Sequence, residues 1–158
     1  MRTITWNASE QMVEMIDQRW LPAEFRLVQY ECFEEIIDAI RTMVVRGAPA
    51  IGVAAAYGLA LAAIHARADN LLDLKRQLHE AGDKLAEARP TAVNLVWALR
   101  RILEKVDRSQ EDLDGLRSLV IEEAQRIADE DVEINQRMAH WGAELLQDGD
   151  TVIHHCNT

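Results

Sequence analysis

Residues 47–64 read GAPAIGVAAAYGLALAAI, a run of 18 residues that contains no charged side chain. A run of this length is at the short limit for crossing a bilayer, and its many Ala and Gly residues gain little from hydrocarbon. Proline is favoured in the first turn of a helix, so Pro49 marks the start of a helix that we expect to continue to about residue 68. The sequence therefore predicts a tightly packed interior helix and not a membrane span.

Strands are expected before this central helix, and further helices on both sides of it. Alternating or β-rich runs predict strands at 3–6, 12–16 and 25–30, of which the first two should form a hairpin. Apolar residues at helical spacing predict helices over about 32–43, 70–86 and 91–106. A further long helix carries one apolar stripe, made of Leu116, Val120, Ala124, Ile127, Ile134, Met138, Trp141 and Leu145.

A different pattern follows the last helix. Residues 147–150 have the composition of a turn, and residues 151–155 that of a buried strand. A strand of this type after a run of helices is typical of the first strand of a parallel α/β domain. We therefore expect an α+β domain over residues 1–147, with a small antiparallel β-sheet plus a helical bundle. Residues 148–158 would begin a truncated Rossmann-like domain.

The composition argues against several classes of protein. The 158 residues include 17 basic and 27 acidic side chains, which gives a net charge of −10. Such a chain does not offer the broad basic surface that nucleic acids and anionic membranes require, so we expect neither as a partner. Two cysteines cannot build a disulfide framework, and no charged-then-apolar leader opens the sequence. We expect a cytoplasmic protein.

Two arginines each stand just before the expected start of a helix. Arg46 precedes Gly47-Ala48-Pro49, and Arg89 precedes Pro90-Thr91. A guanidinium together with the unpaired N–H groups and the positive dipole end of a helix N-terminus would suit a phosphate. Each of these two segments, here called the arginine corners, also has an ordinary structural interpretation. The first would be a helix–helix turn with Arg46 in a surface ion pair, and in the second Arg89 would be solvent-exposed and Thr91 would cap its helix. The two corners together favour a small anion as ligand.

Other polar and aromatic residues leave more than one interpretation open. Cys156 would lie at the C-terminal end of the last expected strand, where α/β proteins place their ligands and where a following helix lowers a thiol pKa. Asp131 and Asn135 are one helical turn apart, and they either reach into a pocket or form hydrogen bonds between helices. The tryptophans are expected to be core aromatics; they are Trp6, Trp20, Trp97 and Trp141.

Three segments occur here in an order that resembles a known family. They are RTMVVRGAPAIG at 41–52, RPTAVNL at 89–95 and HCNT at 155–158. Together with the opening RTITW, they are similar to the N-terminal part of the methylthioribose-1-phosphate isomerase family. Related branches are the ribose-1,5-bisphosphate isomerases and the regulatory subunits of the exchange factor for eukaryotic initiation factor two. The resemblance extends over nearly all of this chain but less than half of a typical family member.

The resemblance implies an aldose–ketose isomerase of methionine salvage that acts on a phosphosugar, 5-methylthioribose-1-phosphate. It assigns substrate binding to Arg46, Gly47, Ala48 and Arg89, and a catalytic role to Cys156. It implies no cofactor and no metal, and a homodimer when the protein is full-length. The catalytic aspartate of the family lies beyond the last residue here, so we expect these 158 residues alone to be inactive.

Three other functions stay open at this stage. The chain could belong to a ribose-1,5-bisphosphate isomerase, to a non-catalytic regulatory relative that binds a nucleotide or sugar phosphate, or to a plain helical interaction domain.

Overall fold

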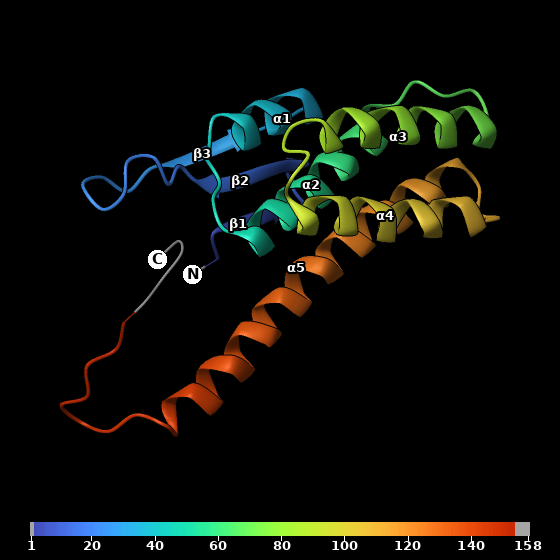
Figure 1. Cartoon of the computed structure of the whole chain (residues 1–158). Coiled ribbons are helices and arrows are strands. Elements are labelled where there is room, and N and C mark those ends of the chain that lie inside the picture. The colour runs from blue at the N-terminus through green and yellow to red at the C-terminus, as the bar shows by residue number, and fades with distance from the viewer. Residues whose placement is uncertain (1, 154–158) are drawn as a thin grey trace.

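The computed structural model of the chain describes residues 2–153, which form a small sheet followed by helices (Figure 1). The strands are β1 (Ile4–Asn7), β2 (Met12–Ile16) and β3 (Leu27–Tyr30). The helices are α1 (Phe33–Arg41), α2 (Ala48–His65), α3 (Leu71–Ala86), α4 (Val93–Arg108) and α5 (Leu113–Ala143). The antiparallel sheet joined to a helical bundle is confirmed.

The three strands form an antiparallel sheet in the order β1-β2-β3. The register pairs Trp6 with Val13 across the first two strands and Val13 with Tyr30 across the second pair. Val13 and Met15 are buried, as expected where alternate residues of one strand face the core. Trp6 stacks on Tyr57 of α2 with ring centroids 5.9 Å apart, so this contact fixes the hairpin to the central helix.

Helix α2 is the centre of the core. Every residue from Ile51 to Ala63 is buried, and the other four helices described here all contact α2. Its glycines mark close approaches, because a Cβ on Gly52 would lie 2.9 Å from the carbonyl oxygen of Asn94 in α4. Within the described residues α2 is the one helix long and apolar enough to cross a membrane, but 72% of it is buried inside the protein. The expected packed interior helix is confirmed.

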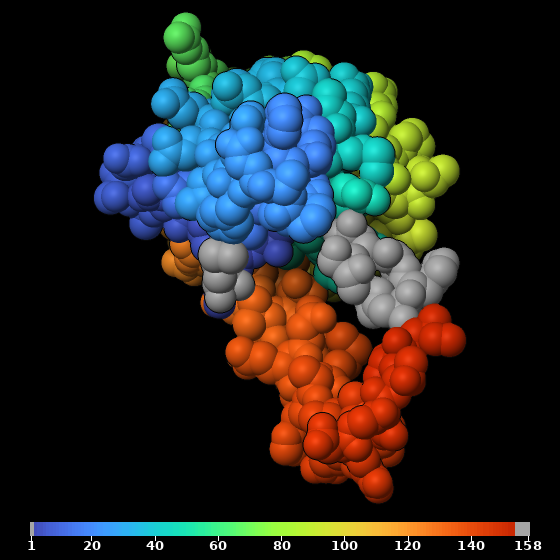
Figure 2. Space-filling view, turned by 90° about the vertical axis from the view of Figure 1, so that its left-hand side faces the viewer, coloured from blue at the N-terminus to red at the C-terminus, as the bar shows by residue number. Residues whose placement is uncertain are grey.

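Only the first half of α5 packs against the bundle. Its apolar residues Leu116, Val120, Ala124 and Ile127 are buried. The second half of the same stripe is 45–83% exposed, and it consists of Ile134, Met138, Trp141 and Leu145. Figures 1 and 2 both show this part of α5, in orange, extending past the rest of the molecule. A stripe at helical spacing is buried only as far as neighbouring elements reach.

Two further expectations differ from the structure. Three of the four tryptophans are not core residues, because Trp20, Trp97 and Trp141 are 45%, 50% and 65% exposed. Residues 151–153 have no regular secondary structure, so the described part of the expected strand at 151–155 is not a strand. Those three residues pair with no neighbouring strand, and a strand is stable only with such a partner.

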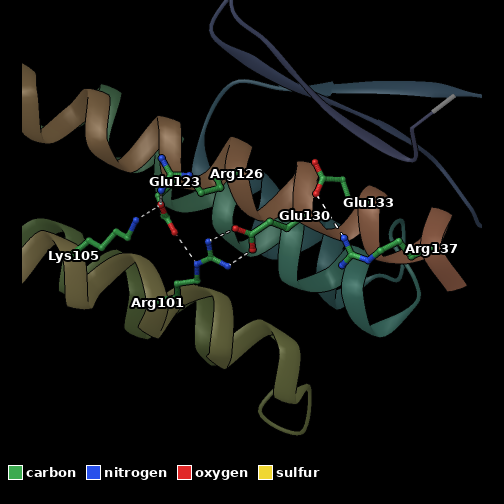
Figure 3. Close-up of polar contacts among 7 residues, drawn as sticks. All are labelled: Arg101, Lys105, Glu123, Arg126, Glu130, Glu133 and Arg137. Carbon is green, nitrogen blue, oxygen red and sulfur yellow. Dashed lines mark hydrogen bonds and ion pairs between the residues drawn. The ribbon is translucent and has the colours of Figure 1, made fainter.

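A cluster of charged side chains joins α4 to α5 (Figure 3). Glu123 is 2% exposed and accepts hydrogen bonds from Arg101, at 2.7 Å, and from Lys105. Arg101 also donates to Glu130, with 2.8 Å between Nη2 and Oε1. Burial alone would raise the pKa of the Glu123 carboxyl, but the hydrogen bonds from Lys105 and Arg101 outweigh burial and lower it. The paired carboxylate therefore stabilises the α4–α5 contact at neutral pH.

We expect Glu123→Gln to lower the free energy of unfolding at pH 7 by about 1.5–3 kcal/mol, the value of hydrogen bonds to a charged group. The pKa of Glu123 in the folded state lies below its ordinary value of 4.5. The stabilisation by Glu123 is therefore complete above pH 4.5, and it is lost as the pH falls through the folded-state pKa. Urea denaturation at pH 7 and pH 3.5 should show a smaller pH effect in the variant. The control Glu133→Gln, on the exposed face of α5, should match wild type.

We expect Gly52→Ala to destabilise the protein by about 1–3 kcal/mol, because the added methyl group would press against the α4 backbone. The matched control is Gly142→Ala in α5, where a Cβ would meet nothing within 4 Å. That substitution should raise stability slightly, by about 0.5–1 kcal/mol, since alanine favours a helix over glycine. Equal effects of the two substitutions in urea denaturation would contradict the close α2–α4 contact.

Candidate anion-binding site

The first arginine corner consists of Arg46 and the N-terminus of α2. Gly47 is the N-cap residue and has φ of 89°, a left-handed conformation that favours glycine. Arg46 immediately precedes it and is exposed. No side chain caps this end of α2, and its first turn has no acidic residue. The N–H groups of a first turn have no acceptor within the helix, so the positive end of α2 is available to an anion.

The second corner is the N-terminus of α4, and it has the same features. The N-cap residue is Ala92 and not Thr91, so the alternative in which Thr91 caps the helix is wrong. No side chain caps α4, and its first turn also lacks an acidic residue. The other three described helices carry acidic residues in their first turns, and side chains of Asn70 and Asp112 cap two of them. Among the described helices, α2 and α4 are therefore the two whose N-termini have neither a side-chain cap nor an acidic residue in the first turn. These are the helices that follow Arg46 and Arg89.

Neither arginine is held by an acidic partner. Within residues 2–153, Arg46 and Arg89 form no hydrogen bond or ion pair through their side chains. Among these residues the alternative of a surface ion pair of Arg46 is therefore not observed, and Arg89, which the alternative placed in solvent, is only partly exposed. Arg89 is half-buried in the α3–α4 loop, where its carbonyl oxygen accepts a hydrogen bond from the Ala92 N–H at 2.9 Å. Both guanidinium groups are available to a ligand.

The two helix N-termini lie side by side, as the contact of Gly52 with Asn94 shows. Two cavities adjoin them. One, of about 640 Å³ and here called the corner cavity, is lined among others by Arg46, Gly47 and Pro49. The other, of about 430 Å³, lies between the first turns of α2 and α4 and the side of α5. Arg89 lines neither cavity, so the structure brings the two helix ends together but does not place both guanidinium groups at one point.

Helix α5 completes the corner cavity. Asp131 and Asn135 line it, as do Leu21 and Pro22 of the loop between β2 and β3. The Asn135 Nδ2 donates to the Asp131 carbonyl oxygen at 2.8 Å and to Asp131 Oδ1 at 3.0 Å. Of the two roles left open by the sequence, the structure shows the one in a pocket, since the hydrogen bonds of this pair stay within α5. Burial raises the pKa of the Asp131 carboxyl.

The remaining expectations about the site concern Cys156 and metal binding. Cys156 lies outside the described residues, as does the remainder of the HCNT segment. Among residues 2–153, no three or more His, Cys, Asp or Glu side chains are arranged to hold a metal ion.

Two solved structures share this arrangement of a small sheet and a helical bundle. The crystal structure of 5-methylthioribose 1-phosphate isomerase from Pyrococcus horikoshii OT3 has a TM-score of 0.88 and 46% identity, over 94% of this chain and 41% of that one. The crystal structure of the translation initiation factor eIF-2B, subunit delta, from A. fulgidus has a TM-score of 0.85 and 41% identity, over 95% and 43%. The fold is therefore that of a domain found in larger proteins.

The sequence comparison agrees with the fold. Residues 44–158 match the model of the initiation factor 2 subunit family, and the chain belongs to this family. The methylthioribose-1-phosphate isomerase of Syntrophotalea carbinolica is 47% identical over 92% of this chain and 43% of its own length. The resemblance found in the three sequence segments is thus confirmed. The chain spans less than half the length of these relatives.

We expect Arg46→Ala and Arg89→Ala each to weaken binding of ribose 1-phosphate about tenfold to hundredfold, because a hydrogen bond to a charged group is lost. Titration followed by NMR, which detects weak binding, would measure this. Arg46→Lys should restore the affinity only in part, since an ammonium is a point charge and cannot make two parallel hydrogen bonds.

The matched control for both arginine variants is Arg100→Ala, because Arg100 is an exposed side chain about two turns beyond the N-terminus of α4 and does not precede a helix. It should bind like wild type. Unchanged affinity in both test variants, with the fold intact, would contradict an anion site at these corners.

Proposed function

We propose that this chain is the N-terminal part of an aldose–ketose isomerase of methionine salvage, which converts 5-methylthioribose-1-phosphate into 5-methylthioribulose-1-phosphate. The observation that carries the proposal is the uncapped N-terminus of α2, which lines a cavity together with Arg46, an arginine that has no acidic partner among residues 2–153. The relatives named as isomerases, at 46–47% identity, support the same reaction class.

In this proposal the helix corners hold the substrate by its phosphate. The Arg46 guanidinium and the N–H groups at Gly47 and Ala48 would donate hydrogen bonds to the phosphate oxygens. Arg89 would contribute a second guanidinium from the neighbouring corner. The glycine at the N-cap lets the phosphate approach the backbone, since no Cβ stands in the way.

The reaction needs proton transfer in addition to phosphate binding. Phosphorylation of the anomeric carbon prevents simple opening of the sugar ring to a free aldehyde. During isomerisation the bond between C1 and the ring oxygen breaks, and the ring oxygen takes up a proton that balances the one lost by the C2 hydroxyl. The hydrogen on C2 moves to C1, and C2 becomes a carbonyl carbon. Atoms and electrons balance within the substrate. Cys156 is the proposed acid–base group of this chain, and the step is faster where water is excluded.

A non-catalytic regulatory role is the second candidate, because the eIF-2B subunit delta structure has the same fold at 41% identity. The HCNT segment at 155–158 and the higher identity to the isomerases favour the enzyme. The test for catalysis below distinguishes the two functions.

We expect residues 1–158 alone to give no ketose product from 5-methylthioribose-1-phosphate. One proposed acid–base group cannot complete the proton transfers, and catalytic groups that act together do not keep proportionate fractions of the rate when some are removed. A fusion of residues 1–158 to the C-terminal part of the Pyrococcus horikoshii isomerase should show turnover, and Cys156→Ser in that fusion should abolish it.

The controls for this assay are the intact Pyrococcus horikoshii enzyme and a thermal melt of the fusion. A folded fusion that makes no product would contradict the proposed function. Turnover by residues 1–158 alone that Cys156→Ser removes would show instead that the rest of the active site lies within this chain.

A further inference from the structure

Asp131 is placed where several cavities meet. It lines the corner cavity, the cavity of about 430 Å³ between the first turns of α2 and α4, and a third of about 370 Å³ beside Arg2 and Thr3. Asn135, one turn further along α5, lines the corner cavity and the third cavity. The half-buried Asp131 and the exposed Asn135 therefore line the same cavity as the N-terminus of α2.

Among residues 2–153, the Asp131 carboxylate forms no ion pair. Arg2, which lines the cavity of about 370 Å³ with Asp131, pairs with Asp129 at 2.6 Å. Arg46 lines the corner cavity with Asp131 but forms no ion pair with it. Within residues 2–153 the Asp131 side chain forms one hydrogen bond, which it accepts from Asn135. The second carboxylate oxygen of Asp131 and the amide oxygen of Asn135 are left as free hydrogen-bond acceptors.

A pair of this kind does not help the domain to fold. A half-buried carboxylate without a counter-ion costs free energy, and its raised pKa reflects that cost. Polar groups that converge on a cavity and lack protein partners are typical of ligand sites, where they fix the orientation of the ligand. The complementary groups are hydrogen-bond donors, since both free atoms are acceptors.

We propose that Asp131 and Asn135 bind hydroxyl groups of a pentose phosphate whose phosphate group lies at Arg46 and the N-terminus of α2. This inference rests on the proposed function and adds two substrate-binding residues to it. The corner cavity, at about 640 Å³, falls in the size range of small-molecule sites. Arg46 and the α5 pair line one cavity from different parts of the chain, so one ligand can contact Arg46 through its phosphate and the α5 pair through its hydroxyl groups.

The test compares two probes, ribose 1-phosphate and inorganic phosphate, in NMR titrations of the full 158-residue chain. Asp131→Asn keeps the side-chain shape, and Asn135→Ala removes the amide. Each should weaken binding of ribose 1-phosphate about tenfold while leaving the affinity for inorganic phosphate within about twofold. The control is Glu133→Gln, an exposed carboxylate on α5 between the two that lines none of these three cavities; it should change neither affinity.

Three results would overturn the inference. If both variants bind ribose 1-phosphate like wild type, Asp131 and Asn135 do not contact the sugar, although the phosphate site stands. If the affinities for both probes fall equally, the pair acts through the fold and not through hydroxyl groups. If the wild-type chain binds inorganic phosphate but gains nothing from the ribose, or binds neither probe, the proposed function itself fails and the inference fails with it.

Discussion

The close packing of α2 is the constraint on which the rest of the structure depends. Its run of alanines and glycines allows α1, α3, α4 and α5 all to contact one helix, which larger side chains would hold further away. At Gly52 the α4 backbone is so near that a methyl group would collide with it. The same contact sets the N-termini of α2 and α4 side by side. The composition of one buried helix thus determines the geometry of the candidate site.

Comparison with the other described helices shows which stabilising interactions are missing at the N-termini of α2 and α4. A side-chain cap contributes about 0.5–2 kcal/mol, and an acidic residue in the first turn adds a smaller amount through the helix dipole. Three of the five described helices carry first-turn acids, whereas α2 and α4 have neither a cap nor an acid. Unsatisfied N–H groups at both corners are destabilising unless water or a ligand pairs with them. The domain keeps them at the two positions that arginines precede.

The fold could be predicted from the sequence to within a few residues for every described helix and strand, because apolar periodicity and the prolines mark their faces and starts. The exposure of the second half of the α5 stripe could not be predicted. The spacing of Ile134, Met138 and Trp141 shows that α5 has an apolar face, but periodicity does not show which elements cover it. The role of Asp131 stayed open for a similar reason. Whether a polar residue beside such a stripe meets a helix or a cavity depends on contacts distant in the sequence.

The negative net charge of the chain limits the ways in which it can bind an anion. A net charge of −10 repels a phosphate at long range, so electrostatic attraction to the whole molecule cannot supply the affinity. The affinity must therefore come from hydrogen-bond donors that act at short range and in fixed directions. The uncapped N-termini of α2 and α4 provide such donors, together with Arg46 and Arg89, which have no ion-pair partner among residues 2–153. Much of the acidic surplus is neutralised locally, as in the pairing of Glu123 with Arg101 and Lys105. Within residues 2–153 Asp131 has no ion-pair partner and lines the same cavity, and in our proposal its carboxylate accepts a hydrogen bond from a sugar hydroxyl of the ligand.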